Sequence, residues 1–222
     1  MDMASIRYKL LILDFDGTMG DTRSLITDTM SQTIHSLHLE ERSREECAKT
    51  IGLPLAECFT TLYPGMSERM GQQCADTYRV HFERNNRPGR VSPFPGVVET
   101  IRELHAQGVI VTIASSRGHR SVEAFVRQLG LERMITYILG GDDVPRAKPA
   151  PDPVWLTLEH YQTTAAKALV VGDTQYDILM GKRAGAAACG VTYGNGSLEE
   201  LQAAGADFLV DHFGCLRDIV LG

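Results

Sequence analysis

Two acidic residues follow a short apolar segment near the start of this 222-residue sequence, and their spacing suits chemistry on phosphorus. Asp14 and Asp16 stand one residue apart at the end of segment 8–13, and Gly17 and Thr18 come next. Two carboxylates confined to one small site repel each other and lose hydration, and a divalent cation relieves both costs. Because a carboxylate held beside Mg²⁺ can attack phosphorus, the segment predicts a phosphoryl-transfer site.

Other apolar segments of the sequence also end in polar, reactive residues. If these segments form adjacent parallel strands, their carboxyl ends lie at one edge of the sheet and the side chains converge on one site. The residues are Ser115, Ser116 and Arg117 after segment 109–114, Lys148 after the loop 140–143, Asp173 after segment 168–171, and Asp177 one helical turn later on the same face.

The charged members of this set suit a site that holds a metal ion. The carboxylates of Asp14, Asp16, Asp173 and Asp177 together make a strongly negative pocket, and oxygen ligands of this kind are the ones that Mg²⁺ prefers. Lys148 supplies a compact positive charge for a phosphate group and for a neighbouring carboxylate. The sequence has no Walker-type glycine loop, so these residues must supply the phosphoryl-transfer site themselves.

The uncharged members suit the oxygens of a phosphate group. Ser115 offers a hydroxyl, and the backbone amide of Ser116 is expected where a strand passes into a loop; both groups can donate to phosphoryl oxygens. Gly17 lets the backbone approach a ligand closely. Arg117 is expected either to contact the phosphate or substrate or to be an exposed charge.

The rest of the sequence alternates between short apolar segments and helical patterns, which predicts an α/β fold. Such alternation indicates a doubly wound parallel sheet covered by helices on both faces, with ligands bound beyond the carboxyl ends of the strands. After the first strand, which ends at Asp14, the predicted strands are 109–114, 137–139, 168–171, 186–192 and 208–210. The predicted helices of this part are 97–107, 121–129, 152–161, 175–184 and 198–204.

Residues 21–90 differ from the rest, because they show helical periodicity and almost no strand pattern. Ser43 with Glu46 three residues later is typical of a capping box, and a long helix is expected from Ser67 to about residue 85. We therefore predict two domains: an α/β core formed by 1–20 and 91–222, and a small α-helical cap formed by 21–90. The cap is inserted after the first strand, where it can act as a lid over the site.

Composition narrows the range of partners and compartments. The net charge is −6 and no basic stripe compensates it, which argues against a nucleic acid or an anionic membrane as partner. The five cysteines are scattered and odd in number, which predicts free thiols in a reducing compartment. No long apolar segment indicates a secretion signal or a membrane span, so a cytoplasmic protein is expected.

The ordered motifs of the sequence resemble those of the haloacid dehalogenase superfamily, in its phosphoglycolate-phosphatase-like branch. The resemblance covers nearly the whole chain, and four motifs on matching strand ends are far more specific than one. They stand as Asp14-Phe-Asp16-Gly17-Thr18, Ile113-Ala-Ser115, Lys148-Pro-Ala-Pro-Asp-Pro153 and Gly172-Asp173-Thr-Gln-Tyr-Asp177, with a lead-in Gly140-Gly-Asp-Asp-Val144 before the third.

This resemblance implies a Rossmann-like core with a helical cap and a mechanism for the site. It implies that Asp14 attacks the substrate phosphorus, and that Asp16 protonates the leaving oxygen and then activates water. It implies a Mg²⁺ ion bound by the Asp14 carboxylate, the Asp16 carbonyl and the Asp173 carboxylate, with Asp177 holding a metal-bound water or orienting Lys148. The phosphate-binding residues implied are Gly17, Thr18, Ser115, Ser116 and Lys148.

The expected activity is a Mg²⁺-dependent phosphatase that acts on a small-molecule phosphate ester, as a monomer or homodimer. A sugar phosphomutase and a pyrophosphatase stay open as alternatives on the same core, and a non-catalytic binding protein is a further one. A dehalogenase or a phosphonate-cleaving enzyme is disfavoured because both lack the second acid of the first motif, present here as Asp16. Ser115-Ser116-Arg117 replaces the Thr-Asn-Lys common in phosphoglycolate phosphatases, which argues against phosphoglycolate as the substrate.

Overall fold

The centre of the protein is a six-stranded sheet in which every neighbouring pair of strands is parallel. The computed structural model describes residues 6–87 and 89–222. The strand order is β5-β4-β1-β6-β7-β8, so the chain starts in the middle of the sheet and then builds outward to both sides. The strands are β1 Leu10–Leu13, β4 Ile110–Ala114, β5 Ile135–Leu139, β6 Ala168–Gly172, β7 Ala187–Val191 and β8 Phe208–Val210.

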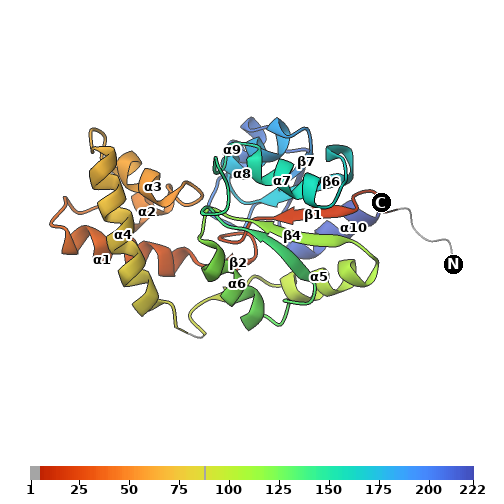
Figure 1. Cartoon of the computed structure of the whole chain (residues 1–222), viewed down its shortest axis with the longest axis horizontal. Coiled ribbons are helices and arrows are strands. Elements are labelled where there is room, and N and C mark those ends of the chain that lie inside the picture. The colour runs from red at the N-terminus through yellow and green to blue at the C-terminus, as the bar shows by residue number, and fades with distance from the viewer. Residues whose placement is uncertain (1–5, 88) are drawn as a thin grey trace.

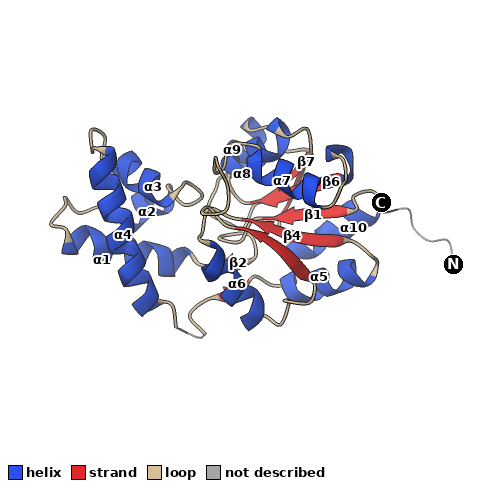
Figure 2. Ribbon diagram, in the orientation of Figure 1, coloured by secondary structure: helices blue, strands red, loops and turns tan. Residues whose placement is uncertain are grey.

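Helices cover both faces of this sheet (Figure 2). The alternation of side chains along β1 sends Leu11 and Leu13 into one hydrophobic core and Leu10 and Ile12 into another. The first core is closed by α5 Val97–Ala106, α6 His119–Gln128 and α10 Leu216–Leu221. The opposite face is covered by α7 Asp152–His160, α8 Gln175–Arg183 and α9 Leu198–Ala203, and short 3₁₀ turns lie at Ala165–Lys167 and Phe213–Cys215.

The doubly wound parallel sheet predicted from the sequence is confirmed. The predicted strands and helices of the core are all present, and their ends differ from the prediction by two residues or fewer. Helix α10 has no counterpart in the prediction. It has only six residues, too few to show a helical period, and unlike the equally short α9 it has no capping box at its start.

Four helices pack together beside the sheet, at its left in Figure 1, around a hydrophobic core of their own. This four-helix cluster consists of α1 Arg23–Ser36, α2 Arg44–Ala48, α3 Leu55–Leu62 and α4 Glu68–Asn85. The capping box predicted at Ser43 is confirmed, since its hydroxyl accepts from the Glu46 amide and Glu46 accepts from the Ser43 amide. In the described ranges, no helix combines the length and the apolar composition that a membrane span requires.

A two-stranded antiparallel ribbon joins the four-helix cluster to the sheet. It pairs β2 Gly20–Asp21 with β3 Ser92–Pro93, so the chain enters and leaves the cluster through neighbouring segments. The sequence did not predict these strands. Two-residue strands that contain glycine and proline carry no alternating pattern and few residues that favour strands.

Candidate active site

The register of the sheet brings three predicted site residues to one edge. Leu13 of β1 is level with Ile113 of β4 and with Val171 of β6, and the Asp14 amide donates to the Val171 carbonyl at 2.8 Å. Asp14, Ser115 and Asp173 therefore all follow their strands directly at the carboxyl edge. Strand β1 has later strands on both sides, which is the topological switch point where α/β sheets bind ligands.

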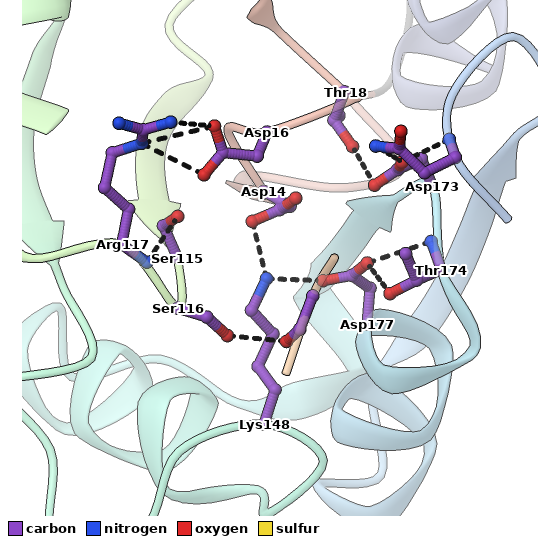
Figure 3. A network of polar contacts seen from close by, with 12 residues as sticks. Asp14, Asp16, Thr18, Ser115, Ser116, Arg117, Lys148, Asp173, Thr174 and Asp177 are labelled. Carbon is purple, nitrogen blue, oxygen red and sulfur yellow. Dashed lines mark hydrogen bonds and ion pairs between the residues drawn. The ribbon is translucent and has the colours of Figure 1, made fainter. Parts of the chain in front are cut away.

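Lys148 is the centre of this site (Figure 3). Its Nζ donates to Oδ1 of Asp14 at 2.5 Å and to Oδ1 of Asp177 at 2.7 Å. All three side chains are at least 96 % buried, so the single cation offsets two carboxylates that water does not reach. Burial opposes the charge of Lys148, but Asp14 and Asp177 outweigh it and raise the pKa of the ammonium group above its ordinary value.

Asp173 is fixed by donors from two other segments. Its Oδ2 accepts from the backbone amide of Asn195 at 2.7 Å and from the Asn195 side chain at 3.0 Å. Its Oδ1 accepts from the hydroxyl of Thr18 at 3.3 Å. Thr18 was predicted to bind phosphate, and in this structure its hydroxyl is directed to Asp173. Asn195 was not predicted as a site residue, although it follows β7 at the same edge of the sheet.

Asp177 orients Lys148 and closes the first turn of α8. Its Oδ2 accepts from the amide and the hydroxyl of Thr174, at 3.1 and 2.8 Å, in a capping box. Its Oδ1 accepts from Lys148. Both oxygens of Asp177 are engaged by the protein itself, which favours the orienting role among the two roles that the resemblance implied.

The acidic residues fit a divalent cation. One carboxylate oxygen from each of Asp14, Asp173 and Asp177 lies within 4.8 Å of the others, and all three residues are buried. Burial, together with the neighbouring carboxylates, raises the pKa of Asp14 well above its ordinary value even though Lys148 lowers it. Burial and the charge of Asp177 raise the pKa of Asp173 to about 7. A group of hard oxygen donors that resists ionisation when empty is a suitable host for Mg²⁺.

We expect the affinity for Mg²⁺ to rise with pH. At pH 6 the Asp173 carboxyl, with a pKa of about 7, must lose a proton before it can bind a cation, and at pH 8 it is already ionised. Isothermal titration calorimetry should therefore show roughly tenfold tighter Mg²⁺ binding at pH 8 than at pH 6. Without metal, this carboxyl holds its proton more tightly in the folded protein, where its pKa is about 7, than at its ordinary pKa of 3.8. The metal-free protein should thus lose stability as the pH rises between these values. An affinity that is constant or falls over pH 6–8 would contradict the assignment.

The absence of a side chain at Gly17 leaves room for the carboxylate of Asp173. Its φ is +85°, and a Cβ atom there would lie 2.0 Å from Oδ2 of Asp173 and 2.3 Å from Nδ2 of Asn195. Replacing Gly17 with alanine should lower the free energy of unfolding by about 2 kcal/mol or more and weaken Mg²⁺ binding by displacing Asp173. Urea denaturation and calorimetry measure the two effects. Gly205→Ala is the matched control, since Gly205 has a φ of +86° and open space around it. Equal effects of the two substitutions on Mg²⁺ binding would contradict this account.

The two serines after β4 make different contacts. The Ser115 hydroxyl is buried and accepts from the backbone amide of Arg117 at 3.2 Å. The Ser116 hydroxyl donates to the carbonyl of Gly52 at 2.7 Å, which links the sheet to the four-helix cluster. A Cβ on Gly52 would lie 3.0 Å from Oγ1 of Thr174, so the Gly52 loop lies directly over the edge of the site.

Arg117 pairs with Asp16, the second acid of the first motif. Its Nε donates to Oδ2 of Asp16 at 3.0 Å and to Oδ1 at 3.2 Å, and Nη2 donates to Oδ1 as well. The Arg117 side chain is only 7 % exposed. Of the two alternatives predicted for Arg117, the exposed charge is therefore wrong, because the carboxylate of Asp16 and three aromatic rings enclose the guanidinium.

Comparison with known proteins assigns this chain to a family of hydrolases. The family model described as haloacid dehalogenase-like hydrolase matches residues 11–191. A protein of Dickeya dadantii named "Probable phosphatase IndB" is 36% identical over 208 residues, which are 92% of this chain and 90% of that protein. The pyrophosphatase PpaX of Anoxybacillus flavithermus is 28% identical over 210 residues, 95% of each chain.

Solved structures show the same fold. The crystal structure of a predicted phosphoglycolate phosphatase from Haemophilus somnus 129PT superposes with a TM-score of 0.85 at 22% sequence identity. The match covers 96% of this chain and 98% of that one. At this identity, the likeness establishes the arrangement of the sheet and helices and leaves the substrate to other arguments.

Proposed function

Because this chain belongs to the haloacid dehalogenase-like hydrolases and is a phosphatase-type enzyme, we propose that it is a Mg²⁺-dependent phosphatase of a small phosphorylated metabolite. The observation that carries the proposal is the contact of Lys148 with both Asp14 and Asp177, next to Asp173. Residues from three distant parts of the chain meet there, and together they supply a nucleophile, a cation for the phosphate and a set of metal ligands.

The proposed reaction has two steps, and both use the first motif. In the first step an oxygen of Asp14 forms a bond to phosphorus, the bond from phosphorus to the leaving oxygen breaks, and Asp16 gives that oxygen a proton. In the second step Asp16 takes a proton from water as the water attacks phosphorus. The bond to Asp14 then breaks, and inorganic phosphate leaves. Lys148 and Ser115 donate to the phosphoryl oxygens during both steps.

The residues proposed to hold Mg²⁺ are the carboxylates of Asp14 and Asp173 and the backbone carbonyl of Asp16. When bound, the ion offsets the negative charge that gathers on the nucleophile and the phosphoryl oxygens. Asp177 is left outside this set, because one of its oxygens pairs with Lys148 and the other closes the first turn of α8. Its role is to keep Lys148 directed at Asp14.

We propose that residues 21–90, which include the four-helix cluster, act as the cap. The hydrogen bond from Ser116 to Gly52 and the proximity of Gly52 to Thr174 support this role, because they bring a loop of the cluster against the edge of the site. A cap in this position excludes water from the phosphoryl group and limits the size of the substrate. The ribbon of β2 and β3 is the natural hinge, since both connections pass through it.

A pyrophosphatase is the second candidate, since relatives at about 28% identity carry the name pyrophosphatase PpaX. The two candidates share the proposed site and differ only in the leaving group, which is an alcohol in one case and phosphate in the other. A cytoplasmic location, a small phosphate ester as the partner and a monomeric or homodimeric state stay predictions from the sequence.

A substrate panel tests the proposal. Phosphate release should be measured from an aryl phosphate, sugar phosphates, nucleotides, phosphoglycolate and pyrophosphate, with Mg²⁺ and with a chelator. The proposal expects turnover of at least one monoester that stops when the metal is removed. Turnover of pyrophosphate alone would support the second candidate, and accumulation of an isomeric sugar phosphate would contradict both hydrolases.

A further inference from the structure

The guanidinium of Arg117 makes hydrogen bonds to two side chains and packs against three aromatic rings. Besides its three hydrogen bonds to Asp16, it donates from Nη1 to the hydroxyl of Ser121 on α6 at 3.2 Å. Its guanidinium carbon lies 4.7 Å from the ring centre of Phe82, 5.4 Å from that of Phe125 and 5.9 Å from that of Phe15. Positive charge on aromatic faces is stabilised, and the planar guanidinium fits such a sandwich.

Both backbone polar groups of Arg117 are also hydrogen-bonded. Its amide donates to the Ser115 hydroxyl, and its carbonyl accepts from the amide of Gly141 at 2.9 Å. The residue that orients the proposed acid–base group is therefore tied to the proposed phosphate-binding serine two positions earlier.

The contacts of Arg117 also cross from the core to the four-helix cluster. Phe82 belongs to α4, and it is stacked on Tyr78 one turn earlier with ring centres 5.8 Å apart. Phe15 and Phe125, which lie on other sides of the guanidinium, belong to the core and stack on each other at 5.0 Å. Of the three aromatic rings against the guanidinium, Phe82 alone belongs to the four-helix cluster, so its contact depends on the position of that cluster.

We propose that Arg117 is a positioning residue that fixes the carboxylate of Asp16 at the reacting group, and that Phe82 completes this hold when the cap is in place. The inference rests on the proposed function, because it assigns a partner to the acid–base residue of that reaction. Figure 3 shows the geometry that carries it, with the guanidinium aligned along both oxygens of Asp16 and away from Lys148. A bidentate contact of this kind fixes the plane of a carboxylate, which a single hydrogen bond does not.

Transient kinetics of Arg117→Met with two classes of substrate tests the proposal. The aryloxide of an activated aryl phosphate is a good leaving group that needs no proton, so attack by Asp14 does not need Asp16. Hydrolysis of the phosphorylated Asp14 still needs Asp16 as the base. The variant should release about one equivalent of phenol in a burst and then turn over on the order of 100-fold more slowly, with kcat/KM for the aryl phosphate unchanged. For an alkyl phosphate, whose leaving oxygen needs a proton, kcat/KM should also fall.

Matched variants separate positioning from a general loss of structure. Arg117→Lys keeps the charge without the planar fork and should recover part of the lost kcat. Phe82→Leu should lower kcat several-fold in the same pattern, whereas Phe59→Leu, in the same helical core but not against Arg117, should not. Arg127→Met, at an exposed arginine of α6, should behave like the unaltered enzyme.

The proposal is overturned if Arg117→Met loses kcat and kcat/KM for the aryl phosphate by the same factor without a burst, or if it loses neither. These outcomes are distinct from failure of the proposed function. That failure would appear as turnover of the unaltered enzyme without Mg²⁺, or as full activity after replacement of Asp14.

Discussion

Replacing Asp14 with asparagine should abolish turnover, with kcat lowered by at least about 10⁴-fold. The amide is nearly the same size as the carboxylate but is a very poor nucleophile, so no covalent bond to phosphorus forms. The fold should survive, because Asp14 lies in a loop after β1 and Lys148 keeps its second partner, Asp177. Steady-state assays on the best substrate of the panel measure the effect, and thermal melting checks the fold.

Asp76→Asn is the matched control for this experiment. Asp76 is an exposed acid on α4 that pairs with Arg79, and its loss should leave kcat unchanged. If Asp14→Asn retained more than about a tenth of the original kcat, Asp14 would not be the nucleophile, since a residue that forms the covalent bond contributes orders of magnitude.

Replacing Lys148 with methionine should damage both catalysis and stability. Methionine has a similar length but no charge, so it leaves Asp14 and Asp177 buried without their shared cation. Removal of one partner from a buried ion pair typically costs 3–5 kcal/mol, so the metal-free variant should lose about that much free energy of unfolding. The kcat should fall on the order of 10²- to 10³-fold, because a charged donor to the phosphoryl oxygens is gone.

Lys182→Met provides the comparison for Lys148. Lys182 also pairs with an aspartate at 2.7 Å, but it and Asp207 are more than a third exposed, so its loss should cost less than about 1 kcal/mol. Urea denaturation with a chelator compares the two variants directly, and added Mg²⁺ should restore part of the stability of Lys148→Met. Equal destabilisation by the two substitutions would contradict the central place given to Lys148.

The convergence of Asp14, Ser115 and Asp173 could be predicted because it depends on short-range patterns. Each of the three strands is mostly apolar and is followed directly by a polar residue, and parallel strands place their carboxyl ends together. Lys148 lies outside any strand, and its place was indicated by the resemblance of its motif to a family. The geometry of residues 14, 148 and 177 then agrees with the expectation that they meet.

The partners of these residues were harder to predict, because they depend on side-chain packing. Nothing in the sequence near Arg117 shows that its guanidinium turns to Asp16 and lies against Phe82, since these residues are far apart in the chain. Asn195 carried a usable signal, a Gly-Asn-Gly loop after a strand at the same edge, but a polar loop residue is usually only a turn former. Thr174 was also readable, as the start of a capping box with Asp177.

The contacts between cap and core could not be predicted for the same reason. The hydrogen bond from Ser116 to Gly52 joins segments 64 residues apart, and it needs a glycine at a φ of +104° to bring the carbonyl close. The ribbon of β2 and β3 is likewise set by where the two connections meet. Such features follow from the assembled fold, whereas the strands and long helices follow from local periodicity.

Trapping of the phosphorylated enzyme tests the central claim most directly. The enzyme should be mixed with Mg²⁺ and excess aryl phosphate, quenched in acid within one turnover, and digested for mass spectrometry. We expect the peptide of residues 10–23 to carry one phosphoryl group that hydroxylamine removes, and borohydride reduction to convert residue 14 to homoserine. An unmodified peptide during active turnover, or a phosphoryl group on another residue such as Asp173, would contradict the account.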